Sequence, residues 1–372
     1  MDKNALKKYA VWARRELMLR VSQRAVFYGV TESDYKDASA DSVNGRVLSP
    51  LEKNQRKALI EQIQKKGYRE VIEEVAYTWF NRFLALRFME VNGYLPAHVR
   101  IFTDENNQFK PQILAEAIHL DLDGLDIERV YAYKEANQTE ELFKYLFIIQ
   151  CNALNTILPK MFQKIEDYTE LLLPDKLLRE GSVIEQMIAL IPEEDWKDAV
   201  QIIGWLYQYY NSEKKDEVFA ALKKNVKITK ENIPAATQLF TPDWIVRYMV
   251  ENSLGRLWLE GHPNEELKAK KLQESWKYYL EEAKQEPEVE AELVKIRAEY
   301  AKLTPEDIRC IDPCQGSGHI LVYLFDVLMQ IYEAYGYTTQ QAVAGIINKN
   351  LYGLDIDDRA AQLAYFAVMM KA

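Results

Sequence analysis

The sequence is poor in several residue types that would define particular classes of protein. It has 3 cysteines with no CxxC pair, and its 4 histidines form no HxxxH or HExxH pair, so neither a disulfide framework nor a zinc site is expected. Only 14 glycines and 12 prolines occur, which excludes a collagen-like or low-complexity chain. No run approaches the ~18 apolar residues of a membrane span, and the N-terminus lacks a signal-peptide core. We expect a cytoplasmic protein without a metal site or membrane contact.

The overall composition is typical of a folded, helix-rich chain of two or three domains, because 48% of the 372 residues are hydrophobic and 28% are charged. The first hundred residues carry 18 Lys and Arg against 12 Asp and Glu, whereas the rest carry 29 against 45. A chain that is acidic overall is not an indiscriminate polyanion binder. The basic start can be a solvated helix face, the commoner case, or a phosphate contact, and its bases are Lys7, Lys8, Arg14, Arg15, Arg20 and Arg24.

Hydrophobic periodicity predicts a mainly helical chain up to about residue 300. Between residues 68 and 91 apolar side chains recur at i, i+3, i+4 and i+7, which predicts a helix with one buried face that ends at Asn92-Gly93. The polar segment 28–45 is predicted to be a loop. Further helices are predicted at 5–28, 51–65, 140–154, 166–173, 183–190 and 194–210.

Residues 264–307 have a different composition, because 20 of these 44 residues are charged. Apolar anchors are few there. This pattern predicts a solvent-exposed helical insertion or hairpin, for which the simplest role is that of a spacer. The candidate anchors are Trp276, Tyr279, Leu280 and Tyr300.

A strand, a glycine turn and a helix are predicted from residue 308 onward. The apolar run 308–312 precedes Pro313–Gly318, and a helical pattern follows over 319–335. Glycines in such a turn let the backbone approach a ligand, and the helix N-terminus then faces it. A dinucleotide loop would have a third glycine where Leu321 stands, and no Gly-Lys-Ser/Thr phosphate loop occurs. Asp312-Pro313 before the glycines fits a third class of ligand loop.

A second strand is predicted at 351–355, after a helix over 339–348 and before another over 359–370. Consecutive strands of a β-α-β unit are expected to be parallel neighbours. Asp355 at the strand tip is placed to accept the ribose hydroxyls of an adenosine. Asp357 or Asp358 beside it can instead cap the next helix.

Three motifs then occur in the order found in DNA adenine methyltransferases that use S-adenosyl-L-methionine. DPCQGSGH (312–319) resembles their cofactor loop, GLDID (353–357) resembles their second motif, and ATQLFTPDWIV (236–246) is similar to the segment that precedes the core. NRFLALRFMEVNGYLP (81–96) and IGWLYQYYNSEKKDEVF (203–219) resemble the N-terminal helical region of the PglX-like methyltransferases of BREX phage-defence systems. The resemblance therefore extends over essentially the whole chain.

This resemblance implies a helical N-terminal domain followed by the opening β-α-β part of a Rossmann-like methyltransferase fold. The implied divisions are a helical domain (1–230), a motif segment (231–263), the charged insertion (264–307) and the first part of the methyltransferase core (308–372). S-adenosyl-L-methionine is the implied cofactor, double-stranded DNA the implied substrate, and other phage-defence or restriction-modification proteins the implied partners. The implied cofactor ligands are Thr237, Thr241, Pro242, Asp312, Pro313, Gly316, Gly318, Asp355 and Ile356.

Some residues near these motifs keep two interpretations. In the family, Ile356 would pack on the adenine face, but a plain core isoleucine is an equal alternative. We expect His319 to be structural and both Cys310 and Cys314 to be small buried groups.

The catalytic Asn-Pro-Pro-Tyr/Phe loop of the family is absent, because the sequence contains no Pro-Pro. We therefore expect the N-terminal, cofactor-binding part of a larger enzyme, with no catalytic residue and no methyl transfer on its own. Two alternatives are a helical DNA-binding or partner-docking module without catalysis and a protein with a fused nuclease. For the nuclease, Pro174-Asp175 and Glu213-Lys214-Lys215 fit a loose magnesium-site pattern, although the second lies in a helical stretch.

Overall fold

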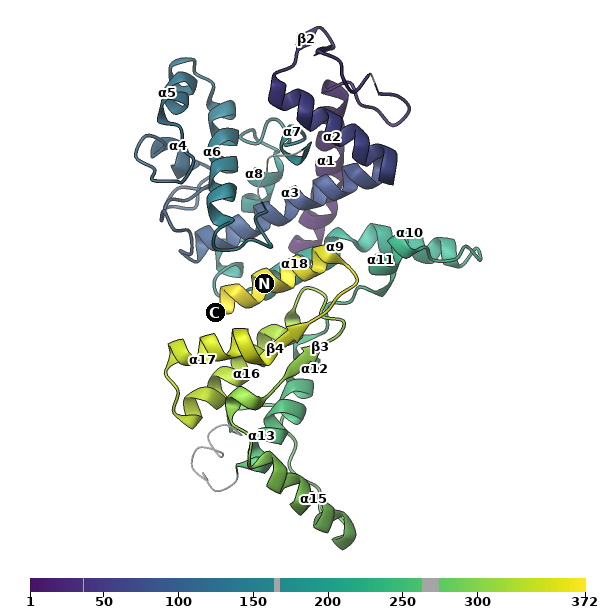
Figure 1. Cartoon of the computed structure of the whole chain (residues 1–372), viewed down its shortest axis with the longest axis vertical. Coiled ribbons are helices and arrows are strands. Elements are labelled where there is room, and N and C mark those ends of the chain that lie inside the picture. Colours follow the sequence, from purple (N-terminus) through teal and green to yellow (C-terminus); the bar gives the residue numbers. More distant parts are fainter. Residues whose placement is uncertain (36, 164–167, 263–273) are drawn as a thin grey trace. The chain divides into compact units, whose positions relative to one another are not determined.

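The computed structural model describes residues 1–35, 37–163, 168–262 and 274–372 (Figure 1). The chain divides into two compact units, Met1–Ala220 and Ala221–Ala372. Both units are mainly helical, which confirms the predicted class of a mainly α chain.

The first unit is built almost entirely from helices. Its elements are α1 (Lys3–Phe27), β1 (Ser42–Val43), β2 (Arg46–Val47), α2 (Pro50–Lys66), α3 (Tyr68–Val91), α4 (Gln112–Ala115), α5 (Ile127–Glu135), α6 (Thr139–Leu154), α7 (Tyr168–Leu171), α8 (Val183–Leu190), a 3₁₀ turn (Glu193–Asp195), α9 (Gln201–Tyr210) and α10 (Ser212–Leu222). The last two residues of α10 already belong to the second unit.

The helix starts follow from side chains that bind the free amides of the first turn. Asp2 accepts hydrogen bonds from the amides of Asn4 and Ala5 at the start of α1. Ser49 and Glu52 form a reciprocal capping box at the start of α2, with Pro50 in its first turn. These local signals explain why the predicted helix bounds lie close to the observed ones.

The core of the first unit lies around α1, which packs against α3, α8 and α9. Tyr9, Phe80 and Tyr210 meet there with almost no exposed surface, and the rings of Phe80 and Tyr210 lie 4.4 Å apart. The apolar face predicted for residues 68–91 is therefore the face of α3 that forms this core.

A buried ion pair holds the segment that follows α3. The guanidinium of Arg87 donates to Glu90 Oε1 over 2.5 Å, and both side chains are fully buried. Glu90 Oε2 accepts the amides of Ile101 and Phe102 at 2.7 and 2.8 Å. Both carboxylate oxygens of Glu90 accept hydrogen bonds, so this side chain fixes the loop after α3 to the helix.

The structure corrects the prediction of a single helix over 194–210. A 3₁₀ turn at Glu193–Asp195 is separated from α9, which begins at Gln201. Between them the side chain of Asn92 donates to the carbonyl of Trp196 (2.9 Å) and accepts the amide of Asp198 (2.8 Å). These long-range bonds hold the backbone out of the helical conformation, and Asp198 has a positive φ of 52°.

Two further predictions need local correction. The predicted loop 28–45 contains the first strand of a small antiparallel hairpin, β1–β2, which turns at Asn44-Gly45 with positive φ at both residues. The predicted helix 166–173 is present only as α7, and residues 166 and 167 lie outside the described part of the chain.

The second unit carries the strand–turn–helix signal. Its elements are a 3₁₀ turn (Lys230–Asn232), α11 (Ile233–Thr237), α12 (Asp243–Val250), a π-helical turn (Glu251–Gly255), α13 (Arg256–Gly261), α15 (Pro287–Tyr300), a 3₁₀ turn (Pro305–Asp307), β3 (Cys310–Asp312), α16 (His319–Tyr335), α17 (Thr339–Gly345), a π-helical turn (Ile346–Asn350), β4 (Leu351–Gly353) and α18 (Asp358–Lys371).

The two strands of the second unit form a parallel pair. Cys310, Ile311 and Asp312 are aligned with Leu351, Tyr352 and Gly353, so the predicted neighbouring strands are confirmed, although each is shorter than predicted. The helix α16 packs against both strands and against α12, α17 and α18. This helix is therefore the centre of the second unit.

The described part of the charged insertion is anchored by Trp276, by the half-buried Tyr279 and by the contact of Tyr300 with Gly261. Trp276 is buried against the π-helical turn, and its indole N–H donates to Gln330 on α16 (2.7 Å). Leu280 is 49% exposed, so this residue is not the apolar anchor that its sequence predicted. The helix α15 has no buried residue, and residues 264–273 lie outside the described part.

Candidate functional site

The glycine turn connects β3 to α16 through two backbone conformations that favour glycine. Gly316 and Gly318 have φ angles of 53° and 86°. A Cβ atom on Gly318 would lie 2.8 Å from the Cα of Ala364 and 2.9 Å from its Cβ, so the turn packs directly on α18. Only glycine satisfies both the angle and the contact at residue 318.

Asp312 lies at the end of β3, beneath the turn, and is 8% exposed. Its Oδ1 atom accepts the amide of Cys314 at 3.0 Å, whereas its Oδ2 atom is buried without a hydrogen-bond partner in the described chain. Burial raises the pKa of this carboxyl above its ordinary value, and the nearby charge of Asp355 raises it further. The Oδ2 atom of Asp312 is thus a buried carboxylate oxygen that can still accept a hydrogen bond.

Asp355 joins the second motif to the glycine turn. Its Oδ2 atom accepts the amide of Gly316 at 2.8 Å, and its Oδ1 atom accepts the amide of Asp357 at 2.8 Å. The cap of α18 is Asp357, which accepts the amide of Arg359 at 3.1 Å. The structure therefore settles which carboxylate caps the helix and leaves Asp355 at the turn.

Three residues of the motifs to which the sequence gave no role, Gln315, Gly353 and Leu354, complete this junction. The amide of Gln315 donates to the carbonyl of Leu354 (3.0 Å), and the amide of Leu354 donates to the carbonyl of Asp312 (2.9 Å). A Cβ atom on Gly353 would overlap the side-chain oxygen of Gln315 and lie 2.8 Å from a methyl group of Leu321. A glycine at a strand end is the sequence signal for such a close approach.

Ile356 is 62% exposed, so the alternative of a plain core isoleucine is wrong. Other apolar side chains around the strands are also exposed: Ile311 (62%), Tyr352 (45%) and Leu354 (61%). The opposite face of the strand pair is the one that α16 covers. The packing of Ile356 on an adenine ring stays a prediction.

The cysteines near the turn differ from the prediction. Cys314 is exposed beside Pro313, because the turn runs over the surface of the unit, so it is not a small buried group. Cys310 is half-buried on β3, and burial raises the pKa of its thiol to about 11. A thiol with a raised pKa is a poor nucleophile at neutral pH.

The segment before α12 reaches the glycine turn through His319. The Nδ1 atom of His319 lies 2.8 Å from the carbonyl oxygen of Thr241, and its ring stacks on Phe240. Pro242 is exposed and leads into α12. The hydroxyl of Thr237 donates to Ile233 within α11, and no described hydrogen bond links Thr237 to the turn. The structure thus brings Thr241 to the turn and leaves Thr237 apart from it.

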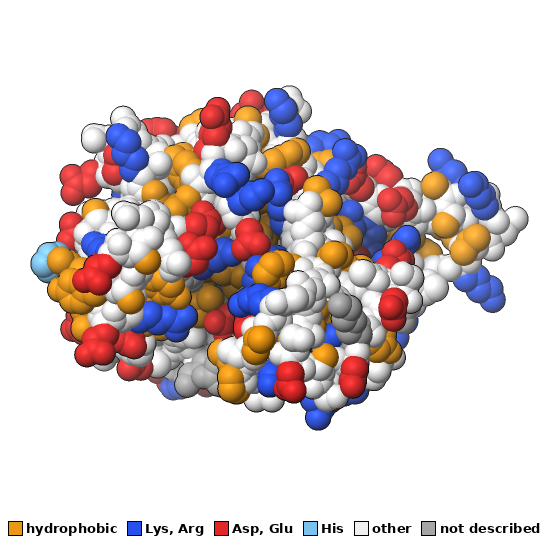
Figure 2. Space-filling view, turned by 90° about the horizontal axis from the view of Figure 1, so that it is seen from above, with side chains coloured by type: hydrophobic (Ala, Val, Ile, Leu, Met, Phe, Trp, Pro, Cys, Tyr) orange, Lys and Arg blue, Asp and Glu red, His pale blue; other side chains and the backbone are white. Residues whose placement is uncertain are grey.

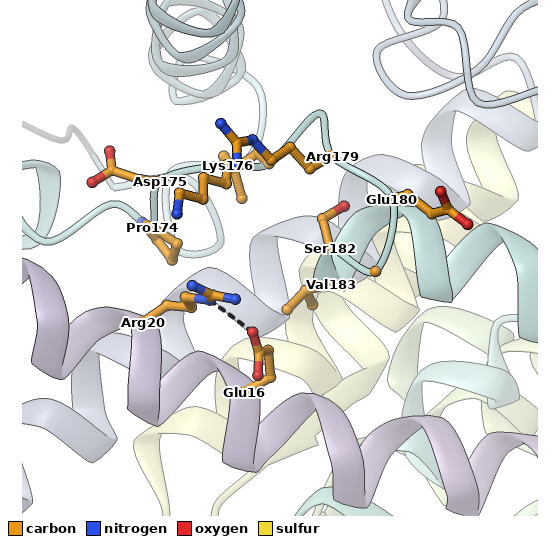
Figure 3. Close-up of a pocket in the computed structure, with 11 residues that line it drawn as sticks. Glu16, Arg20, Pro174, Asp175, Lys176, Arg179, Glu180, Ser182 and Val183 are labelled. Carbon is orange, nitrogen blue, oxygen red and sulfur yellow. Dashed lines mark hydrogen bonds and ion pairs between the residues drawn. The ribbon is translucent and has the colours of Figure 1, made fainter.

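The nuclease pattern does not form a metal site in the described residues. Pro174 and Asp175 line a cavity of about 250 Å³ between α1 and the loop before α8 (Figure 3). Asp175 is paired with Arg24 and Lys144, which lower the pKa of its carboxyl against the effect of burial. No group of three His, Cys, Asp or Glu side chains that could hold a metal occurs in the described chain. The fused-nuclease alternative therefore lacks structural support.

The second half of that pattern is also engaged in ion pairs. Glu213 is paired with Arg15, and Lys214 with Glu73. Both residues therefore connect α10 to helices of the same unit and leave no carboxylate for a metal.

Most of the basic residues at the start of the chain are paired as well. Arg14 contacts Glu73 at 3.1 Å and Arg20 contacts Glu16 at 2.7 Å, while Arg15 and Arg24 hold the carboxylates named above. On the face seen in Figure 2, Lys and Arg side chains are interspersed with Asp and Glu. This pairing favours a structural role for the helix over a phosphate contact.

No helix in the described ranges is both long enough and apolar enough to cross a membrane.

The chain is similar over its whole length to two curated proteins. It is 40% identical to an adenine-specific methyltransferase PglX of Lacticaseibacillus casei (strain Zhang) and 41% identical to an adenine-specific methyltransferase BrxX of Escherichia coli O9:H4 (strain HS). It covers 32% and 31% of their lengths, so it spans about a third of each. Over 34% of the chain it is 33% identical to a putative type II restriction enzyme and methyltransferase of Methanocaldococcus jannaschii, of which it covers 11%. No protein-family model matches.

Proposed function

We propose that this chain, a homologue of the PglX/BrxX adenine-specific methyltransferases over its whole length, supplies the S-adenosyl-L-methionine site of a site-specific DNA adenine methyltransferase. The proposed site consists of the glycine turn, Asp312 beneath it, and Asp355 and Ile356 after β4. Thr241 and Pro242 border it from the preceding segment. The second unit is then the opening of a Rossmann-like fold, and the enzyme acts in phage defence or restriction-modification.

One observation carries this proposal: Asp355 Oδ2 accepts the amide of Gly316 at 2.8 Å. The bond lies beyond the carboxyl ends of two adjacent parallel strands, where open α/β sheets bind nucleotides and related ligands. It brings two motifs that are 39 residues apart into one junction.

The donors and acceptors of the junction fit the cofactor. Asp312 Oδ2 is a buried oxygen without a partner in the described chain, and it is suited to the ammonium group at the methionine end. Each carboxylate oxygen of Asp355 accepts one hydrogen bond from a backbone amide and has capacity for a second, from a ribose hydroxyl. The exposed Ile356 offers an apolar surface to the adenine ring.

The cofactor supplies a methyl group on a positively charged sulfur, which is a strong electrophile. The residues of this chain hold and orient that cofactor, so their contribution is to positioning. Adenine in a duplex must leave the base stack to react, and in the family a separate Asn-Pro-Pro-Tyr/Phe loop would hold its amine. This sequence has no Pro-Pro, so the 372-residue chain alone is proposed to transfer no methyl group.

Isothermal titration of S-adenosyl-L-methionine into the 372-residue chain tests the site. We expect Asp355→Ala to weaken binding by about tenfold or more, a loss of roughly 1.4 kcal/mol, through the lost ribose contacts. The matched control is Asp358→Ala, because Asp358 is exposed in the first turn of α18 beside the proposed ligand. Equal affinity in wild type and Asp355→Ala would remove Asp355 from the site.

Methyl transfer is the second test. Radiolabelled cofactor and mixed-sequence duplex DNA are incubated with the chain alone and with a protein of the length of its relatives. Label is expected in DNA only with the longer protein. Label with the 372-residue chain would place catalytic residues within it. A chain that neither binds the cofactor nor transfers a methyl group would favour the non-catalytic helical module.

A further inference from the structure

His319 occupies an unusual position in the proposed site. It follows Gly318 directly as the first residue of α16, yet its side chain is only 8% exposed. The histidine therefore turns inward at the point where the glycine turn becomes a helix.

Its ring contacts three residues of the segment 240–243, which lies 76 to 79 positions earlier in the chain. It stacks on Phe240 with ring centroids 4.4 Å apart and planes 5° from parallel. Its Nδ1 atom lies 2.8 Å from the carbonyl oxygen of Thr241, and its Nε2 atom lies 3.6 Å from a carboxylate oxygen of Asp243. These contacts surround the ring on one face and at both nitrogens.

The hydrogen bond to Thr241 determines the tautomer. A backbone carbonyl only accepts, so the Nδ1 atom must carry the proton and donate it. The side chain therefore acts as a fixed N–H donor at the start of α16, directed at the backbone of the segment before α12.

We propose that His319 is a positioning residue, which holds Phe240, Thr241 and Pro242 against the glycine turn and so forms one wall of the cofactor site. That this wall matters for S-adenosyl-L-methionine rests on the function proposed above. The placement of residues 240–242 does not depend on that function, because it follows from the stacking on Phe240 and the hydrogen bond to Thr241. A second unit without His319 would keep its strand pair and lose the connection between the segment and the turn.

A second histidine of the same unit provides a matched control. His262 also stacks on an aromatic ring, that of Trp258, at 3.8 Å. Its ring nitrogens lie 3.1 Å from the carbonyl oxygens of Trp258 and Leu303. None of these partners belongs to the motifs, so a variant of His262 shows what the loss of a similar stacked histidine costs the fold alone.

Three variants separate the ring stacking of His319 on Phe240 from its hydrogen bond to Thr241. His319→Ala removes both, His319→Phe keeps the ring against Phe240 but removes the donor, and His319→Asn keeps a short amide donor but removes the ring. His262→Ala is the control. Hydrogen exchange followed by mass spectrometry then measures the protection of the amides in residues 238–246, without any cofactor.

We expect His319→Ala to increase the exchange of these amides by about tenfold or more, since the segment then opens locally, with β3 and β4 unchanged. His319→Phe and His319→Asn should fall between. His262→Ala should leave residues 238–246 as protected as in the wild type. Unchanged exchange of 238–246 in His319→Ala, or an equal increase in His262→Ala, would overturn the positioning role.

Titration with S-adenosyl-L-methionine forms the second arm. His319→Ala is expected to bind the cofactor about tenfold more weakly, with partial recovery in His319→Asn, and His262→Ala to bind like the wild type. Increased exchange together with unchanged affinity would show that the segment is held by His319 but is no part of the site. Increased exchange in a chain whose wild type binds no cofactor would refute the proposed function and leave the positioning of the segment standing.

Discussion

Two buried carboxylates, Glu90 in the first unit and Asp312 in the second, differ in how their oxygens are hydrogen-bonded. In the first unit the carboxylate of the buried Glu90 is filled by Arg87, Thr103 and two backbone amides, and the result is a fixed loop. In the second unit Asp312 is almost as buried, but one of its carboxylate oxygens has no partner in the described chain. A filled network stabilises a fold, whereas an unfilled buried acceptor costs stability and is suited to a ligand. Glu90 therefore has a structural role, and Asp312 is the carboxylate that we propose as a ligand contact.

Glu90→Gln should produce the largest loss of stability. The neutral side chain leaves the buried Arg87 with no carboxylate of the described chain nearer than Glu193 at 4.0 Å, which we expect to cost about 3–5 kcal/mol in the free energy of unfolding. Chemical denaturation monitored by circular dichroism measures this free energy. The control is Glu74→Gln, since the pair of Glu74 with Lys66 is exposed and should contribute less than ~1 kcal/mol. Equal losses in both variants would show that the buried network is not what stabilises the first unit.

Gly318→Ala should destabilise the second unit both through its backbone angle and through a close contact. The added methyl group meets Ala364 at 2.8 Å in a backbone conformation with φ of 86°, so we expect a loss of about 2–3 kcal/mol. Gly336→Ala is the matched control, because Gly336 has φ of 107° and nothing within 4 Å of an added Cβ. It should lose about 1 kcal/mol from the backbone alone. If the two variants are equally stable, the contact between the turn and α18 is not tight.

Glu73→Gln should show a smaller loss that depends on pH. Burial opposes ionisation of Glu73, but the charges of Lys214 and Arg14 outweigh it and hold the pKa of the carboxyl below its ordinary value. Because the folded-state pKa of Glu73 is lowered, the ionised carboxylate stabilises the fold at pH values above the unfolded-state pKa of ~4.3. This stabilisation disappears as the pH falls through the lower, folded-state pKa. We expect a loss of about 2 kcal/mol at pH 7 that shrinks below pH ~4. A loss of the same size at every pH would contradict the ion-pair explanation.

A contrast between local and long-range contacts explains what the sequence could predict. Helix bounds such as those of α2 and α3 depend on neighbours in the chain, on Ser49 and Glu52 at one start and Gly67 at the other, so they were predicted closely. The break before α9 depends on Asn92, more than a hundred residues away, and no local pattern reports it. Hydrophobic periodicity cannot predict a hydrogen bond between a side chain and a distant part of the backbone.

The candidate site shows the same limit. The motif glycines and Asp355 could be named from spacing and resemblance, but only the hydrogen bonds distinguish Asp355 at the turn from Asp357 at the helix cap. Gln315 and Gly353 were not singled out, because their relation is a contact between two chain segments. His319 was expected to be structural, and its contacts with Phe240 and Thr241 could not be read from the sequence.

The smallest effect on stability is expected at Ile356. Because this side chain is 62% exposed, Ile356→Ser should change the free energy of unfolding by less than ~0.5 kcal/mol. Its affinity for S-adenosyl-L-methionine should nevertheless fall several-fold, about 1 kcal/mol, through lost contact with the adenine ring. Ile311→Ser, at an equally exposed position on β3, is the control. Equal affinities for wild type and Ile356→Ser would leave the adenine ring without this contact.

Photochemical crosslinking of radiolabelled S-adenosyl-L-methionine to the chain, followed by peptide mapping, locates the cofactor on the chain. The site proposed here predicts label in peptides that contain residues 310–319 or 351–357, and loss of that label when unlabelled S-adenosylhomocysteine competes. Label confined to peptides of the first unit, with the same competition, would contradict the proposed cofactor site in the second unit.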